Sequence, residues 1–327
     1  MSCTAIRVHY KRPSVLHGRS NVVTVTPGHT REREGATMER IIREEIVGFV
    51  RKSPDNRFPE SRVPFFDAPQ IGFASARDPL FEQFKQIIGD FHLTPAEIMR
   101  DCHGPAMGEA ETVICWILPI TRTTRESNRH QERVPSREWA LTRGSGEQFN
   151  TLLRMFVVDL LRQRGVLAVA PLLSGMWSPI RQEPVGLAST WSERHAAYVA
   201  GLGTFSLSDG LITERGIAHR CGSVITNARI TPTPRTARDH QSNCLYFSRG
   251  SCGLCIQRCP VGAISRQGHD KERCREYVYE TLRNATGREY GTTESGCGLC
   301  QTGVPCEACI PPASKTRQLT LQPAHKG

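Results

Sequence analysis

Apolar residues recur at helical spacing in several separate stretches of the chain. The residues 94–99 open with Thr94 as a candidate cap and Pro95 in the first turn, and the longest stretch ends at Gly165. Five stretches carry this pattern and predict helices: residues 38–52, 80–88, 94–99, 147–165 and 192–200. The pattern therefore predicts a body that is rich in helices from Met38 onward.

Short runs of apolar residues lie between these helical stretches. Residues 112–120, "TVICWILPI", predict a buried strand, and residues 166–173 and 221–226 predict two more. Alternation of helices with buried strands favours an α/β fold, layered as in α/β or α+β proteins, for residues 38–240. Residues 1–37 show neither period and predict a flexible N-terminal arm, unless the chain starts at Met38.

The composition changes near residue 241 to one rich in cysteine, glycine and proline. We expect a second, smaller domain over residues 241–312, followed by a tail over residues 313–327. Of thirteen cysteines in 327 residues, nine lie between residues 244 and 309, several in C-x2-C units. This spacing favours metal ligation over disulfides and a reducing compartment.

Net charge and hydropathy limit the classes of partner that we expect the chain to bind. No apolar run approaches the roughly 18 residues of a membrane span, and no signal sequence opens the chain, so we expect a cytoplasmic protein without a membrane partner. The net charge of +10 permits contact with nucleic acid or with an acidic redox protein. The basic residues are scattered, however, and a plain solvated surface explains them equally well.

A cysteine motif near residue 251 predicts iron–sulfur chemistry. "SCGLCIQRCPVGAI" contains Cys252, Cys255 and Cys259, and Pro260 follows the last. The bacterial motif C-x2-C-x2-C-x3-C-P has one more cysteine, at the position of Arg249 here. Cys244 supplies that thiolate from a longer loop, because loop length costs free energy only logarithmically.

Eight cysteines match the need of two 4Fe–4S cubanes, so we expect residues 241–312 to form a ferredoxin-like domain with two clusters. A chain that wraps two cubanes usually lends the cysteine before proline to the other cluster. The expected ligands of the first cluster are Cys244, Cys252, Cys255 and Cys306, and those of the second are Cys259, Cys274, Cys297 and Cys300. Spacing alone leaves Cys309 open as a substitute for Cys306 or Cys274. One tetrahedral zinc on the two C-x2-C pairs is the alternative, but the proline and the cysteine count favour cubanes.

Four further segments within residues 110–310 are informative: "AGLGTFSLSDGLIT" (200–213), "RCGSVITN" (220–227), "CREYVYE" and "CGLC". Together they resemble the epoxyqueuosine reductase family of cobalamin-dependent iron–sulfur enzymes, which are related to reductive dehalogenases. The resemblance implies an α/β domain that binds base-off cobalamin and two clusters that relay electrons to cobalt from an external ferredoxin or flavodoxin. It also implies Cys274 as a ligand and a cofactor-binding turn with Gly201, Gly203, Ser208 and Gly210. By themselves these glycines fit a plain helix end equally well.

Two features depart from that family. Leu187 stands where the resemblance implies an aspartate as proton donor, so Glu193, His195 and Tyr198 become the candidate proton donors. Only 18 residues follow Cys309, whereas tRNA-modifying members commonly add a helical-repeat domain. We therefore expect a related reductase with another, unidentified substrate, with tRNA as the alternative.

Two further interpretations stay open at this point. An electron-transfer protein without cobalamin needs no proton donor and accounts for Leu187 directly. A regulatory protein that senses redox state would use its clusters to change DNA or protein binding. The interpretation that we favour is an iron–sulfur reductase with two clusters and a corrinoid.

Overall fold

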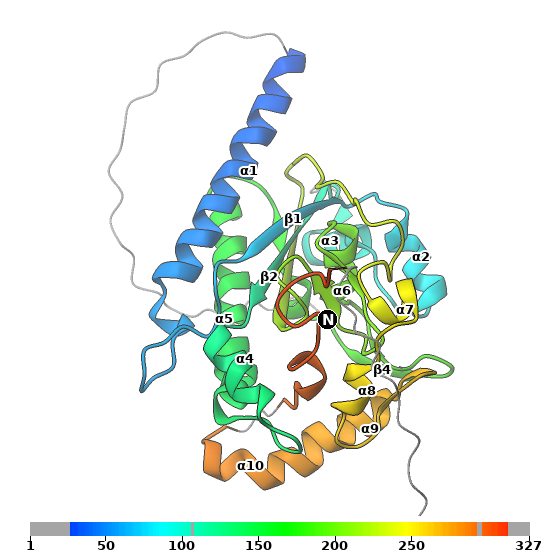
Figure 1. Ribbon diagram of the computed structural model, residues 1–327. Coiled ribbons are helices and arrows are strands. Elements are labelled where there is room, and N and C mark those ends of the chain that lie inside the picture. The colour runs from blue at the N-terminus through cyan, green and yellow to red at the C-terminus, as the bar shows by residue number, and fades with distance from the viewer. Residues whose placement is uncertain (1–26, 106–107, 293–295, 313–327) are drawn as a thin grey trace, which may run out of the picture.

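A four-stranded antiparallel sheet forms the centre of the molecule (Figure 1). The computed structural model describes residues 27–105, 108–292 and 296–312, and side chains from residue 36 onward. The sheet has the order β1-β2-β8-β3, and its strands are β1 (Gln70–Ser75), β2 (Thr112–Pro119), β8 (His219–Thr226) and β3 (Ala168–Val169). The buried strand expected over residues 112–120 is thus the central β2, and it pairs with β8 over its full length.

Helices cover both faces of this sheet, so the body has three layers (Figure 1). Alternate residues of a strand point to opposite faces, and β2 is buried on both. One face packs against α1 (Pro27–Lys52) and α5 (Arg137–Arg162). The other packs against α2 (Leu80–Ile87), α3 (Pro95–His103) and α6 (Glu193–Val199). The layered mixed α/β fold expected from the sequence is present.

Close packing explains one glycine of the sheet. Gly222 of β8 lies opposite Trp116 of β2, and a Cβ at Gly222 would lie 2.2 Å from Cε2 of that indole. The indole Nε1 of Trp116 donates to Oδ1 of Asn150 on α5 at 2.9 Å. A buried donor that keeps its partner avoids a desolvation penalty, so this contact fixes α5 against the sheet.

Two helices begin earlier than the sequence predicts. α5 starts at Arg137, ten residues before the expected Glu147, because Ser136 caps it by accepting from the backbone N–H of Trp139. α1 starts at Pro27 rather than Met38, so it includes part of the predicted flexible arm. Its first turns extend beyond the sheet (Figure 1), where a helix needs no apolar stripe. Residues 1–26 of the arm and the tail from residue 313 lie outside the described residues.

The remaining elements of the body are short. Between α3 and α5 lies α4 (Arg122–Arg129), and two hairpins follow α5. These hairpins are β4 (Pro179–Gln182) with β5 (Gly186–Ser189), and β6 (Gly203–Phe205) with β7 (Leu211–Thr213). Single 3-10 turns occur at Pro54–Asn56 and Pro171–Leu173.

The cysteine-rich segment contains only short elements, several of which lie along the bottom of the molecule in Figure 1. They are α7 (Leu245–Arg249), α8 (Leu254–Gln257), β9 (Ile264–Ser265), β10 (Gly268–His269), α9 (Lys271–Glu276), a π-helix (Tyr277–Leu282), α10 (Arg283–Tyr290) and a 3-10 turn (Leu299–Gln301). Its small apolar core includes Leu207, Ile212 and Ile217 from the β6–β7 region. The segment therefore packs directly on the body.

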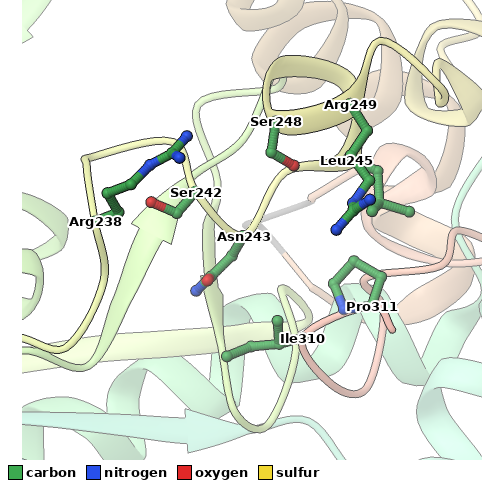
Figure 2. Close-up of a pocket in the computed structure, with 8 residues that line it drawn as sticks. All are labelled: Arg238, Ser242, Asn243, Leu245, Ser248, Arg249, Ile310 and Pro311. Carbon is green, nitrogen blue, oxygen red and sulfur yellow. The ribbon is translucent and has the colours of Figure 1, made fainter. Parts of the chain in front are cut away.

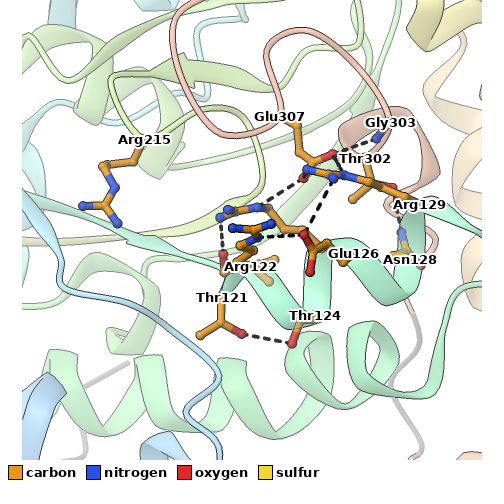
Figure 3. Close-up of polar contacts among 12 residues, drawn as sticks. Thr121, Arg122, Thr124, Glu126, Asn128, Arg129, Arg215, Thr302, Gly303 and Glu307 are labelled. Carbon is orange, nitrogen blue, oxygen red and sulfur yellow. Dashed lines mark hydrogen bonds and ion pairs between the residues drawn. The ribbon is translucent and has the colours of Figure 1, made fainter.

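Glu307 ties the end of this segment to α4 (Figure 3). Its carboxylate is almost fully buried and accepts from Arg129 at 2.7 Å and from Arg125 at 3.2 Å. The backbone N–H of Gly303 also donates to it, at 2.8 Å. A carboxylate that is buried with two guanidinium partners holds its chain segment firmly. In the described part of the chain, no helix is long and apolar enough to cross a membrane.

Candidate functional site

A cavity of about 1170 Å³ lies between the layered body and the cysteine-rich segment. The body contributes side chains of α2, α5 and α6 and of the β4–β5 hairpin. The cysteine-rich segment contributes residues from Cys259 to Gln301, including β10 and α9. Sites of this kind, at the junction of two structural units, commonly bind ligands.

Four of the predicted metal ligands form one group of thiols on the wall of this cavity: Cys259, Cys274, Cys297 and Cys300. Burial raises the pKa of Cys297 to about 12, and the neighbouring thiols of Cys274 and Cys259 contribute to the rise. Burial also raises the pKa of Cys300, with Cys297 and Cys274 adding to it. Thiols that raise one another's pKa lie close together. The structure thus brings together the four cysteines expected to hold the second cluster.

The other four predicted ligands form a second group of thiols: Cys244, Cys252, Cys255 and Cys306. They line a small apolar cavity of their own. Burial raises the pKa of Cys306, and Cys244, Cys255 and Cys252 add to the rise. Burial likewise raises the pKa of Cys255 to about 12, with contributions from Cys244 and Cys252. These are the four cysteines expected to hold the first cluster.

The two groups of thiols are neighbours. Cys300 lines both cavities, and the Cys255 thiol contributes to the raised pKa of Cys300. None of the described cysteines is in a disulfide, and Cys309 is exposed. Among the described residues, no three His, Cys, Asp or Glu side chains converge tightly enough to ligate one ion.

Arg258 positions the turn that carries Cys300. Its guanidinium donates to the carbonyl oxygens of Leu299 and Thr302 at 3.2 and 3.0 Å, and to that of Gln131 at 2.9 Å. One side chain thus bridges α8, the 3-10 turn and the end of α4. Such charge-assisted hydrogen bonds are stronger than neutral ones, and they fix the backbone on which the thiols stand.

Glu193, one of the three predicted proton donors, does not line the cavity. Its side chain is buried and accepts from Arg154 at 3.0 and 2.6 Å, and from the backbone N–H of Ser223 at 3.0 Å. Burial raises the pKa of Glu193, whereas Arg154 opposes that rise. Arg154 is itself completely buried. This geometry gives the carboxylate a structural partner and no access to a ligand.

His195 and Tyr198, the other two predicted donors, do line the cavity. The Nδ1 of His195 is 2.7 Å from the hydroxyl of Ser192, and the ring packs against Phe84 and Phe205. Burial, with Arg194 adding to it, lowers the pKa of His195 to about 3, so the imidazole is neutral at pH 7. At pH 7 the ring therefore almost never carries the additional proton that it would have to donate as an acid. Tyr198 presents a phenolic hydroxyl, which is a hydrogen-bond donor.

Leu187, at the position of the expected aspartate, lines the same cavity from β5. Its neighbours in the hairpin, Ala188 and Ser189, also line it. The site where the resemblance implies an acid is therefore apolar and faces the cavity. The proton donor of this chain, if the cavity is an active site, has to come from another element.

Three predicted cofactor-binding glycines are explained by contacts within the chain. A Cβ at Gly201 would lie 2.7 Å from the carbonyl oxygen of Pro234, and one at Gly203 would lie 2.5 Å from that of Ile212. Gly201 has a φ of 72° directly after α6, which fits the helix-end alternative weighed above. Gly210 is likewise crowded, by the side chain of Ile217. Of the four residues predicted to bind the cofactor, Ser208 alone lines the large cavity.

The structure adds cavity residues that sequence reasoning missed. Asp209, with a φ of 57°, pairs with His269 of β10, and Oδ2 of Asp209 is 3.1 Å from Nδ1 of His269. Burial opposes protonation of His269, but Asp209 and Cys274 outweigh it and raise its pKa to about 9. Arg143 and Arg220 also line the cavity. No spacing signal marks these residues, because the pairing joins elements that are far apart in the sequence.

A smaller pocket, of about 290 Å³, lies beside the first group of thiols (Figure 2). Arg238 and Arg249 stand on opposite sides of it, with Ser242 between them. Leu245 and Pro311 line both this pocket and the cavity of the first thiols. The pocket that contains Arg238 and Arg249 therefore adjoins the cavity of the first group of thiols at Leu245 and Pro311.

Comparison with known proteins gives matches in solved structures alone. No family model and no curated protein matches the chain. A selenomethionine-labelled epoxyqueuosine reductase has 18% identity and a TM-score of 0.48, and that of Bacillus subtilis has 17% and 0.48. In both cases the match covers 83% of this chain and 66% of the other. A reductive dehalogenase, described as suggesting a mechanism for B12-dependent dehalogenation, has 14% identity, a TM-score of 0.43, and coverage of 71% and 29%. These are distant similarities in the arrangement of the chain, so the function has to be argued from its own residues.

Proposed function

We propose that the chain is an iron–sulfur oxidoreductase with two 4Fe–4S clusters and a corrinoid in the large cavity. The observation that carries the proposal is the sorting of eight cysteines into two neighbouring groups of four, one of which forms a wall of that cavity. Four thiolates are the ligand set of one cubane. When bound, the clusters would supply low-potential electrons, and the corrinoid the metal centre at which an unidentified substrate is reduced.

The residues of the chain have distinct tasks in this proposal. Cys244, Cys252, Cys255 and Cys306 would hold the first cluster, and Cys259, Cys274, Cys297 and Cys300 the second. Arg258 and Glu307 orient the loops that carry these cysteines. A cavity of about 1170 Å³ exceeds the usual range for drug-sized ligands, about 300 to 1,000 Å³, and suits a large planar cofactor with a substrate beside it.

Tyr198 is the residue that we propose as proton donor. It lines the cavity and carries a donor hydroxyl. Glu193 is engaged by Arg154, and the low pKa of His195 keeps that imidazole neutral. Tyr198→Phe should therefore reduce turnover while cluster content and corrinoid binding persist. An unchanged turnover in this variant would remove Tyr198 from the role.

The decisive experiment is anaerobic reconstitution of the full chain, followed by titration with cob(II)alamin and EPR. We expect about eight iron atoms per chain and a base-off cobalt signal that survives desalting. Zinc in place of iron would overturn the cluster assignment. Two reducible clusters without retained corrinoid would leave an electron-transfer protein instead.

That second function is favoured by one observation, the apolar Leu187 on the cavity wall. A protein that only transfers electrons needs no acid at this position. Its α/β body would then serve to dock a redox partner. A tRNA substrate is a further alternative; the net charge of +10 supports it, and tRNA affinity that falls steeply with salt would be its signature.

A further inference from the structure

Beside the cavity, four charged side chains form a continuous series of ion pairs. The buried Arg154 bridges two carboxylates, donating to Oε1 of Glu147 at 2.9 Å and to Oε2 of Glu193 at 2.6 Å. Arg220 donates to the other oxygen of Glu147, also at 2.6 Å. Burial opposes ionisation of Glu147, yet Arg220 and Arg154 outweigh it and lower its pKa to about 2. Glu147 is thus ionised, and each oxygen of the two carboxyl groups already has a guanidinium partner.

Arg143 adds a third guanidinium beside this network. It stands on α5, one helical turn before Glu147, and Arg220 lowers the pKa of Arg143 through charge repulsion, with burial adding to the effect. The described residues provide it with one neutral partner, the hydroxyl of Tyr279 at 3.2 Å, and with no carboxylate at ion-pair distance. Three guanidiniums against two carboxylates leave one positive charge in excess. That charge lies where Arg143 and Arg220 both line the cavity.

The other charged side chains on the cavity wall are also mainly positive. Of the described residues that line it, one is acidic, Asp209, and five are Lys or Arg: Arg143, Arg194, Arg220, Lys271 and Arg275. Asp209 is already paired with His269, and Arg275 is paired with Glu272 and Glu280, so the excess of positive charge rests on the other four cations. Uncompensated cations with low-dielectric walls raise the local concentration of anions. The charge of the cavity therefore selects for an anionic occupant.

We infer that Arg143 and Arg220 form an oxyanion-binding site in the large cavity, for a carboxylate or phosphate group of the molecule that binds there. Guanidinium groups match both anions in shape and in hydrogen bonding. The site lies beside the second group of thiols, because a Cβ at Gly296, the residue before Cys297, would lie 2.6 Å from Cγ of Arg143. An anion held here is therefore held close to those thiols. The inference rests on the proposed function only for the nature of the occupant.

The test is a titration of the reconstituted full chain with inorganic phosphate, followed by calorimetry at low ionic strength. Arg143→Gln should weaken phosphate binding about tenfold or more, and Arg143→Lys should weaken it less, because the charge is kept and the fork is lost. Arg122→Gln is the matched control, since it removes the same charge from an exposed pair with Glu126 on α4 (Figure 3). Equal affinity in wild type and Arg143→Gln, or an equal loss in the control, would overturn the inference.

The anion could belong to the corrinoid or to the substrate. A phosphate titration with and without bound corrinoid distinguishes these two sources. If the site holds the phosphodiester of the corrinoid, cob(II)alamin abolishes phosphate binding and Arg143→Gln weakens corrinoid retention. If it holds a substrate group, phosphate still binds to the corrinoid-loaded chain. Either result supports an oxyanion site. The inference fails, without any change to the cluster assignment, if phosphate binds neither to the chain that holds corrinoid nor to the chain without it.

The inference and the proposed function fail separately. Iron content and corrinoid retention report on the proposed function, and the phosphate titration reports on the charge network of the body. If no iron is incorporated, the same titration on the chain as purified still measures the site. A loss of phosphate binding in Arg143→Gln, at unchanged iron content, would support the inference alone.

Discussion

Cys306 and Cys309 are three residues apart, and their surroundings differ. Cys306 is largely buried beside three other thiols, whereas Cys309 is exposed. We expect Cys306→Ser to lose up to half of the reconstituted iron, because a cubane with three thiolates is bound less firmly. Cys309→Ser should keep the full iron content. Iron and sulfide analysis after anaerobic reconstitution measures both, and equal losses in the two variants would contradict the assignment.

Glu193 and Tyr198 both belong to α6, but we propose different roles for them. Glu193 neutralises the buried Arg154, whereas Tyr198 donates a proton. Glu193→Gln removes one of the two carboxylates that neutralise the buried Arg154, so we expect a loss of about 3 kcal/mol in the free energy of unfolding. Urea denaturation of the two variants measures the difference. Tyr198→Phe should unfold close to the wild-type midpoint. A Glu193→Gln variant with unchanged stability would show that Arg154 is neutralised by Glu147 alone.

At the scale of residues, the sequence marks the chemistry-bearing cysteines but gives no signal for the cations of the cavity. Short-range spacing marks Cys252 and Cys255, because neighbours in a C-x2-C unit must lie close in space. No comparable spacing joins Arg143 to Arg220, which meet only after α5 packs on β8. Long-range pairs of this kind depend on tertiary packing, and periodicity does not report it.

Among the elements, the loop around Glu307 is the one whose anchoring bears most on the thiols. The N–H groups of Ile217 and Ala218 donate to the carbonyl oxygens of Cys306 and Glu307. Because these two donors directly precede β8, the hydrogen bonds attach the loop to the start of that strand. Glu307→Gln would leave Arg125 without its carboxylate partner, and Arg129 with Glu126 alone, at 4.0 Å. We expect lower thermal stability and faster loss of iron from the first group of thiols.

The control for that variant is Glu126→Gln. Glu126 also pairs with an arginine of α4, but it is exposed, and exposed pairs contribute about 0–1 kcal/mol. Thermal denaturation and the rate of iron release to a chelator compare the two variants. Equal behaviour would mean that the buried tether of Glu307 does not hold the loop.

The sequence predicts best those elements whose structure depends on residues that are close together in the chain. The capping box of α3 is present, with Thr94 accepting from the backbone of Glu97, and β2 is buried as expected. The start of α5 was missed because Gly144 and Gly146 lower the local helix propensity. Packing explains Gly146, since a Cβ there would lie 2.9 Å from Cζ of Phe66. Strand order is likewise set by packing rather than by local pattern.

For the whole molecule, buried neutral histidines predict sensitivity to acid. Burial, with Lys85 adding to it, lowers the pKa of His92 to about 4, from 6.5. The unfolded chain therefore binds this proton first, and stability falls as the pH drops from 6.5 towards 4, by about 1.4 kcal/mol per pH unit. His92 packs between Phe84 and Trp191, so His92→Phe keeps the aromatic contacts.

Urea denaturation at pH 7 and pH 5 tests this dependence. Between the two values, wild type should lose about 2 kcal/mol more than His92→Phe. Burial also lowers the pKa of His195 and of His219, so some acid sensitivity persists in the variant. Identical losses in both proteins would show that His92 is not the source.

A second prediction for the whole molecule concerns the entry of electrons. Arg249 lines the basic pocket beside the first group of thiols, where an acidic ferredoxin or flavodoxin could dock (Figure 2). We expect Arg249→Glu to slow reduction by an acidic ferredoxin on the order of tenfold at low salt, because it reverses charge steering. Reduction by dithionite should be unaffected, and stopped-flow absorbance measures both. Equal rates with ferredoxin would place the entry point elsewhere.

The proximity of the two groups of thiols, with Cys300 lining both cavities, has a consequence for the number of electrons available. A cubane exchanges one electron, whereas reduction of an organic substrate commonly needs two. Two groups side by side, with one at the surface pocket and the other at the cavity, would let a one-electron donor charge the protein in two successive visits. The reaction in the cavity could then draw on a complete pair of electrons, without waiting for a second encounter.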